Sequence, residues 1–406
     1  MIRLRTALTA FFALDGFLFA GWVVRIPAVK QQTGASAGDL GLALLGVSAG
    51  AVATMMLTGR LCRRFGNAPV TVAAGVLISL GVALPPLAGS ALALGLLLLV
   101  FGSAYGAVNV AMNSAAVDLV AALRRPVMPA FHAAFSLGGM LGAGLGGLLA
   151  GRLTVGRHLT LLAVAGLLVT AVAGRTLLRH PLPPAAAGRT TREPGTAARH
   201  SPARGDAPAG RHPRGTVAVL GLIALCTAYG EGALADWSAL HLTEDLGAGP
   251  GVAAAGYSVF ALAMTAGRLS GTALVHRLGE VRTLVGGGLT AACGMLLGSL
   301  APTVWAALAG FVVTGFGLAN IFPVAIGRAG ALAGPRGVAA ASTLGYGGML
   351  LGPVAIGFLA EGTSLPRALT SVAALAAVAA TVAWAARHSL RGDGARASAG
   401  RAVGGR

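Results

Sequence analysis

Long apolar stretches recur along this chain, and short polar segments separate them. Each stretch has about 20 residues or more, the length that an α-helix needs to cross the hydrocarbon core of a bilayer. They lie at residues 6–29, 39–60, 69–88, 92–118, 129–152, 158–178, 216–240, 252–275, 282–300, 304–327, 338–361 and 367–387. The pattern therefore predicts an all-α, polytopic membrane protein with twelve transmembrane helices.

The composition agrees with this pattern and excludes several classes of function. Of the 406 residues, 55% are hydrophobic and 10% are charged, and the mean hydropathy is +0.78. Soluble domains carry about 25% charged residues, so a soluble enzyme and a disordered chain are both excluded. The sequence contains neither a G-x-x-x-x-G-K-[ST] phosphate loop nor an H-E-x-x-H zinc motif, and Cys62, Cys226 and Cys293 lie far apart. We expect no enzymatic activity, cofactor or metal site.

The basic residues predict the orientation in the membrane. A net charge of +18 would suggest nucleic acid in a soluble protein, but here the arginines occupy the breaks between apolar stretches, so no nucleic-acid partner is expected. With a cytoplasmic N-terminus, the cytoplasmic breaks hold Arg3, Arg5, Arg60, Arg63, Arg64, Arg124, Arg125, Arg277, Arg282, Arg328 and Arg336, and the external ones Arg25, Lys30, Arg152, Arg157 and Arg367. Both termini are predicted to be cytoplasmic, in the inner cell membrane.

One long polar segment divides the chain. Residues 180–214 are rich in Pro, Ala, Gly and Arg and hold almost no large apolar side chain, so they are predicted to form a disordered cytoplasmic linker. The predicted domains are a six-helix bundle at 1–179, this linker, a second six-helix bundle at 215–390 and a cytoplasmic tail at 391–406. The linker and tail are interpreted as solvated tethers, with contact to anionic lipid as the alternative.

The two predicted bundles share a repeated pattern. Several short motifs recur in the same order and at nearly one separation along the chain. The matching pairs are Asp15-Gly16 with Glu231-Gly232, Trp22 with Trp237, Arg64-Phe65-Gly66 with Arg277-Leu278-Gly279, Asn109 with Asn320, and Gly138-Gly139 with Gly347-Gly348. We interpret the chain as two related halves.

Two parallel six-helix halves resemble the major facilitator superfamily. The loop at Gly59–Gly66 is similar to the family signature G-x-L-A-D-R-x-G, with Arg64 at the conserved basic position. The family's Asp is replaced by Arg63, and its second-half counterpart is His276, so the cytoplasmic latch that this Asp implies must be altered or absent. The segments Arg25–Pro27, Met128–His132 and Glu231–Trp237 look most like the fucose-permease-like group of that family.

Two carboxyl groups inside apolar stretches are candidates for proton coupling. An ionisable side chain in a bilayer costs about 2.5–3.5 kcal/mol and normally faces the bundle interior. Asp15 is near the middle of the first stretch and Glu231 is somewhat past the middle of the seventh. Either carboxyl could bind a proton on one side and release it on the other. The alternative is a carboxyl held by a hydroxyl, an amide or an arginine for packing.

A second set of polar and aromatic residues is predicted to bind the solute. Tyr105, Asn109 and Asn113 share one face of the fourth stretch, and Asn320 is the repeat counterpart of Asn109. Amides both donate and accept hydrogen bonds, which suits a polyhydroxylated solute; interhelical hydrogen bonding is the alternative. Trp22 and Trp237 could stack on a sugar or belong to the interfacial aromatic belt.

The remaining charged residues are candidates for gating. Arg25 and Asp236 lie near the external ends of the first and seventh stretches and could pair as an external gate; two solvated interface charges are the alternative. Asp118, near Arg124 and Arg125, and His132 at the start of the fifth stretch could form a cytoplasmic polar cluster. Arg63 and Arg64 belong to the cytoplasmic loop described above.

These patterns predict a monomeric secondary active transporter that works by alternating access. The favoured function is proton-coupled movement of a small, sugar-like polar solute, with membrane lipid as its surroundings. A proton-coupled exporter of amphipathic compounds is the first alternative. A membrane sensor or scaffold that does not transport is the second.

Overall fold

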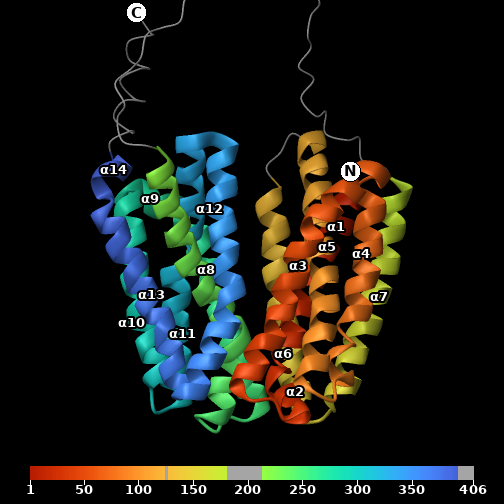
Figure 1. The fold of residues 1–406 in the computed structure, drawn as a ribbon. Helices are drawn as coiled ribbons and strands as arrows, with labels where there is room; N and C mark the ends of the chain where they lie inside the picture. The colour runs from red at the N-terminus through yellow and green to blue at the C-terminus, as the bar shows by residue number, and fades with distance from the viewer. Residues whose placement is uncertain (124–126, 181–212, 392–406) are drawn as a thin grey trace, which may run out of the picture.

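The computed structural model describes residues 1–123, 127–180 and 213–391 and forms two helical bundles (Figure 1). Among these residues there is no strand. The first bundle contains α1 (Ile2–Val23), α2 (Ile26–Thr33), α3 (Ala37–Phe65), α4 (Asn67–Gly81), α5 (Ala91–Leu123), α6 (Met128–Ala150) and α7 (Val155–Arg179), with the short 3-10 helix η1 (Pro85–Leu87) between α4 and α5. The predicted linker 180–214 and tail 391–406 lie almost entirely outside the described residues.

The second bundle continues from α8 to the short helix α14. It contains α8 (Pro213–Glu244), α9 (Pro250–Leu278), α10 (Glu280–Leu300), α11 (Val304–Leu318), α12 (Ile321–Gly362), α13 (Leu365–Ala385) and α14 (Arg387–Arg391). In the described part of the chain, 12 helical segments are long and apolar enough to cross a membrane, which confirms the predicted fold class. Two of these spans, Val304–Ala333 and Ala340–Gly362, share α12.

Two helix breaks were not predicted from the apolar pattern. The first predicted span, 6–29, ends early at Val23, and a separate α2 begins after Arg25 with a proline in its first turn. A proline fits a first helical turn because no backbone N–H is needed there. The second break falls at Asn320, which lies between α11 and α12 inside one membrane span.

The repeated Arg-x-Gly loops have the same backbone geometry in both halves. Gly66 joins α3 to α4 with φ +90°, and Gly279 joins α9 to α10 with φ +82°. These positive φ angles are unfavourable for residues with a Cβ atom, so glycine is required at both turns. The repeat seen in the sequence is therefore a repeat of structure here.

Glycine also allows close helix crossings at equivalent places in the two halves. A Cβ atom on Gly138 of α6 would overlap the Ala13 carbonyl oxygen of α1, and one on Gly348 of α12 would overlap the Leu225 carbonyl oxygen of α8. In a bilayer, such close backbone contact replaces the hydrophobic driving force between helices. One glycine of each Gly-Gly pair, Gly138 and Gly348, is explained by these two crossings.

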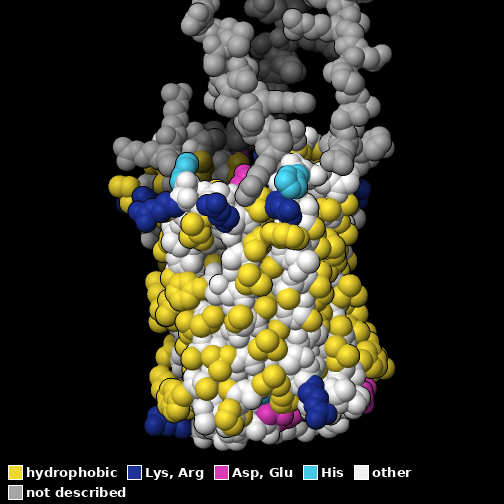
Figure 2. Space-filling view, turned by 90° about the vertical axis from the view of Figure 1, so that its left-hand side faces the viewer, with side chains coloured by type: hydrophobic (Ala, Val, Ile, Leu, Met, Phe, Trp, Pro, Cys, Tyr) yellow, Lys and Arg dark blue, Asp and Glu magenta, His cyan; other side chains and the backbone are white. Residues whose placement is uncertain are grey.

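The two halves contact each other at the end opposite the termini. The N-terminus and α14 lie at one end of the molecule, at the top of Figure 1. At the other end, the Lys30 Nζ atom is 2.7 Å from the Glu244 carboxylate, joining the halves. Gly147 of α6 packs against Gly251 at the start of α9. The lateral surface between the ends is mainly hydrophobic, and charged side chains gather at the two ends (Figure 2), as expected for a surface that faces lipid.

Candidate transport site

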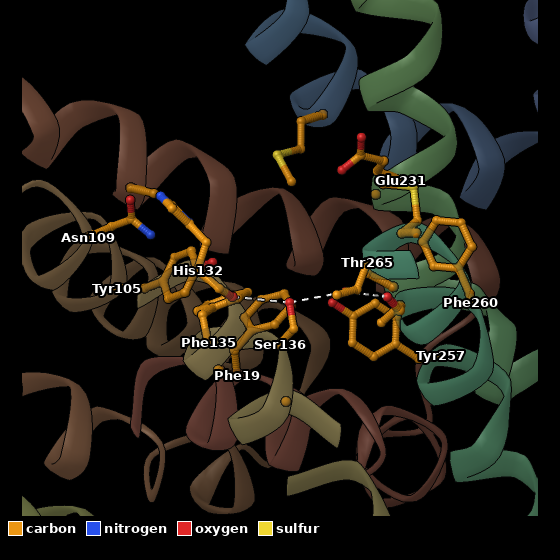
Figure 3. Close-up of a pocket in the computed structure, with 18 of the residues that line it drawn as sticks. Phe19, Tyr105, Asn109, His132, Phe135, Ser136, Glu231, Tyr257, Phe260 and Thr265 are labelled. Carbon is orange, nitrogen blue, oxygen red and sulfur yellow. Dashed lines mark hydrogen bonds between the residues drawn. The ribbon is translucent and has the colours of Figure 1, made fainter. Parts of the chain in front are cut away.

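A cavity of about 620 Å³ lies between the two halves (Figure 3). Its wall comes from α1, α3, α5 and α6 of the first half and from α8, α9 and α12 of the second. Among the described residues that line it, none belongs to α11, so the tenth predicted span does not reach it. The volume is within the usual range for a site that holds one small molecule.

Asp15 lies directly behind the wall of this cavity. It is fully buried on α1, next to the lining residue Gly16. The Asn109 side-chain amide donates to the Asp15 Oδ2 atom at 3.5 Å, while the Oδ1 atom has no hydrogen-bond partner in the described part of the protein. An ionised carboxyl that is buried in this way needs a proton or a cation to neutralise it.

The two asparagines of α5 act as a pair, but only one of them lines the cavity. The Asn113 amide donates to the backbone and side-chain oxygen atoms of Asn109 at 2.8 and 3.3 Å. This fixes the Asn109 side chain between Asn113 and Asp15. Asn109 lines the cavity beside Tyr105, as Figure 3 shows, whereas Asn113 supports it from behind.

Glu231 faces the cavity and is paired with an arginine that the sequence analysis missed. The Arg268 Nη2 atom on α9 lies 3.1 Å from both Glu231 carboxylate oxygens, and its Nε atom lies 3.4 Å from the Ala319 carbonyl oxygen. Arg268 lies inside the predicted span 252–275, and an ionisable residue within a span is itself the signal that marks a functional candidate.

We expect substitutions of Glu231 and Arg268 to have non-additive effects on the free energy of unfolding. Glu231→Gln or Arg268→Gln leaves the other charge unpaired beside the cavity, whereas the double variant removes both charges. Because both side chains are partly exposed, the expected coupling free energy is about 1 kcal/mol. Thermal unfolding of the detergent-purified single and double variants measures it, and additive losses would contradict the ion pair.

Aromatic rings form the part of the cavity between the two halves. Phe19 of α1 stacks on Tyr105 at 5.1 Å between ring centroids and meets Tyr257 of α9 edge-on at 6.4 Å, and Phe260 lies 6.4 Å beyond Tyr257. The Thr265 hydroxyl donates to the Ser136 Oγ atom across the halves at 3.1 Å, one of the hydrogen bonds dashed in Figure 3. Polar and aromatic groups of both halves therefore face the same cavity.

Comparison with known proteins identifies the family. The Major Facilitator Superfamily profile matches residues 6–230. The chain belongs to this superfamily of transporters. An uncharacterized MFS-type transporter of Yersinia pestis is 35% identical over 384 residues, 94% of each chain, and the membrane protein MosC of Rhizobium meliloti is 30% identical over 378 residues, 92% of this chain and 88% of that one.

Solved structures of other transporters share the fold. The nucleoside transporter NupG superposes with a TM-score of 0.71 at 14% identity, covering 94% of this chain and 98% of its own. A bacterial homolog of the human lysosomal transporter Spinster, in an inward-facing conformation, superposes with a TM-score of 0.71 at 16% identity, covering 96% and 97%. With the family match, the chain is a multi-pass membrane transporter whose substrates are small molecules.

Besides Asn113, three more of the predicted solute-binding residues do not line the transporter's cavity. Trp22 and Trp237 are buried in the packing of their own halves, so they are neither wall residues nor part of an interfacial belt. The Phe101 ring of α5 packs beside the Trp22 ring. Asn320 donates to the Gly267 carbonyl oxygen at 2.9 Å, where it joins α9 to the break before α12. The two tryptophans and Asn320 point into contacts between helices, so these side chains stabilise the packing of the helices.

Arg25 and Asp236 do not form the predicted gate. The Arg25 guanidinium donates to the His158 Nδ1 atom at 2.9 Å and to the Ala150 and Leu153 carbonyl oxygens at 3.2 and 3.3 Å, which ties the end of α1 to the α6–α7 turn. Burial lowers the pKa of Arg25 from its ordinary value. Asp236 instead lines the cavity. At the end opposite the termini, the Lys30–Glu244 pair described above joins the two halves.

Of the residues predicted to gate the cytoplasmic side, the structure describes His132, Asp118, Arg63 and Arg64. His132 lines the cavity, with its ring edge-on to Phe12 at 5.4 Å. Asp118 accepts from the Asn67 amide at 2.6 Å at the start of α4. Arg63 and Arg64 are exposed at the end of α3, and Arg124 and Arg125 lie outside the described residues. His132 therefore belongs to the cavity, and Asp118 joins α5 to the start of α4.

Two serines occur in the spacing G-x-S-x-G, which in hydrolases marks a nucleophile. Ser36, between Gly34 and Gly38, caps α3, and Ser48, between Gly46 and Gly50, lies within α3. The nucleophile elbow needs a turn from a strand into a helix. Neither serine has that setting, so the spacing carries no catalytic meaning here.

Proposed function

We propose that this protein is a proton-coupled secondary transporter that moves a small polar solute by alternating access. The observation that carries the proposal is the cavity between the halves, with a fully buried carboxyl, Asp15, behind its wall. Rocking of the halves would expose this cavity to one side of the membrane and then to the other.

The polar groups of the wall support a small polar solute as the substrate. Tyr105, Asn109, His132 and Tyr257 present hydroxyl, amide and imidazole groups to the space between the halves. Sugar-like solutes match such mixed donors and acceptors. NupG, which shares the fold, is a nucleoside transporter, in line with a polar solute, and the fucose-permease-like motifs favour the same class.

The contact between Asn109 and Asp15 supports proton coupling through Asp15. Asn109 contacts the solute space on one side and the Asp15 carboxylate on the other. A solute that hydrogen-bonds to Asn109 would change the amide's contact with Asp15 and so the free energy of its protonation. Glu231, held by Arg268, fits better as a solute-facing charge than as the proton carrier.

The positive-inside pattern favours cytoplasmic termini in the inner membrane. The halves meet at the end opposite the termini, so this orientation makes the structure inward-facing, with external contacts closed. We propose that the transporter works as a monomer in this state and in an outward-facing counterpart.

One observation favours the alternative, a proton-coupled exporter of amphipathic compounds. The wall also carries a patch of large apolar side chains, among them Val52, Met55, Met264 and Leu269. An amphipathic compound would bury its apolar part against this patch.

Transport in liposomes tests both functions. Purified protein is reconstituted with a pH-sensitive dye outside, and sugars, nucleosides, amines and cationic amphiphiles are added one at a time. External alkalinisation with a polar solute is the expected result. Proton movement with amphiphiles alone would favour the exporter, and silence with every compound would overturn the proposed coupling.

A further inference from the structure

The charges of the cavity wall do not balance. Among the described residues that line it, Glu231 and Asp236 are acidic and Arg268 is basic. Arg268 is paired with Glu231 through both carboxylate oxygens. The Asp236 carboxyl is therefore left on a largely apolar wall without a basic side chain of its own.

Asp236 has no partner in the described part of the protein. No hydrogen bond or ion pair joins it to another described residue, although it lies on α8 only five positions after Glu231. Arg25, which the sequence suggested as its partner, is bound instead to His158 and to backbone carbonyls. A carboxyl group held in this position either takes up a proton or binds a positive charge beside it.

The surroundings of Asp236 suit an organic cation. Tyr257 lines the same cavity as Asp236, Glu231 and Arg268. The Tyr257 ring belongs to the chain of aromatic contacts through Phe19, which lines the same cavity. Aromatic faces attract ammonium groups, and a carboxylate supplies a charge-assisted hydrogen bond to the N–H atoms.

We propose that Asp236 binds a protonated amine of the transported solute, with the rings of Tyr257 and Phe19 beside it. The assignment rests on the proposed function and narrows its substrate class to small polar solutes that carry an amine, such as amino sugars or amino alcohols. The polar part of the solute would face Asn109 and His132 across the cavity, and Arg268 would keep Glu231 from competing for the amine.

Matched pairs of solutes test this subsite. Binding of glucosamine, glucose, N-acetylglucosamine, ethanolamine and ethylene glycol to the purified full-length protein is measured by calorimetry, and transport is measured in liposomes. We expect at least one amine to bind about tenfold or more tightly than its neutral partner. In Asp236→Asn, binding of that amine should weaken about tenfold or more, while binding of the neutral partner stays within about twofold.

Asp245→Asn is the matched control, because Asp245 follows the end of α8 and pairs with His241, outside the cavity. The Asp245→Asn protein should bind the amine and its neutral partner with the same affinities as the wild type. Equal binding of amine and neutral solutes, or equal losses for both in Asp236→Asn, would overturn the subsite while leaving transport itself established. If no solute of any kind bound or moved, the proposed function and the subsite would both be wrong.

Discussion

Replacing Asp15 with Asn is expected to abolish proton-driven accumulation of the solute while exchange of solute across the membrane continues. The substitution keeps the shape of the side chain and its contact with Asn109, but it removes the group that binds the proton. Without a titratable group behind the wall, the loaded and empty states no longer differ in proton content. We expect accumulation to fall at least about 50-fold, to the leak of the liposomes.

Two assays in the same vesicles separate the steps. Accumulation under an imposed pH gradient reports coupling, and counterflow with solute on both sides reports the conformational cycle alone. Asp245→Asn removes a carboxylate that does not line the cavity, and it should accumulate solute normally. An Asp15→Asn protein that still concentrated solute would show that the proton is carried elsewhere.

A disulfide between Gly147→Cys and Ala254→Cys is expected to stop transport completely and reversibly. A Cβ atom on Gly147 would lie 2.9 Å from the Ala254 Cβ atom, across the contact between α6 and α9. Disulfides need Cβ atoms about 3.5–4.5 Å apart, so a shift of about an ångström allows the bond. Because the halves must separate here to open outward, oxidation should reduce transport more than about 20-fold, and dithiothreitol should restore it.

A cysteine background and a neighbouring position provide the controls for the disulfide. Cys293 is exposed and is replaced by serine, while Cys62 and Cys226 are buried and are kept. A Cβ atom at Gly144 would meet no neighbouring atom within 4 Å, so Gly144→Cys with Ala254→Cys should not crosslink. Full transport by the oxidised 147–254 pair would mean that these ends of the halves never part.

The spans were predictable because they depend on a local property. A run of about 20 apolar residues in a bilayer must satisfy its backbone hydrogen bonds internally, and an α-helix does so. The breaks at Arg25 and Asn320 were not predictable, because apolar residues continue through them. Tertiary contacts decide where each helix ends: Arg25 hydrogen-bonds to His158, and Asn320 hydrogen-bonds to Gly267.

The candidate site was predictable only in part. An ionisable residue in a span is costly wherever it points, so Asp15 and Glu231 stood out. The sequence does not say what lies opposite each side chain. Glu231 meets Arg268, while Asp236 meets the cavity in place of Arg25. The tryptophans were misplaced because the repeat fixes their depth along a helix but not the face of the helix that they occupy.

The alternate opening of the cavity to the two sides is the central claim, and labelling of Val52→Cys tests it most directly. Val52 lines the cavity on α3. In the Cys293→Ser background, a membrane-impermeant maleimide is applied to right-side-out and inside-out vesicles, with and without the 147–254 disulfide. We expect labelling from both sides in the free protein and only from the side of the termini in the locked one. Labelling from that side alone in both forms would contradict alternating access.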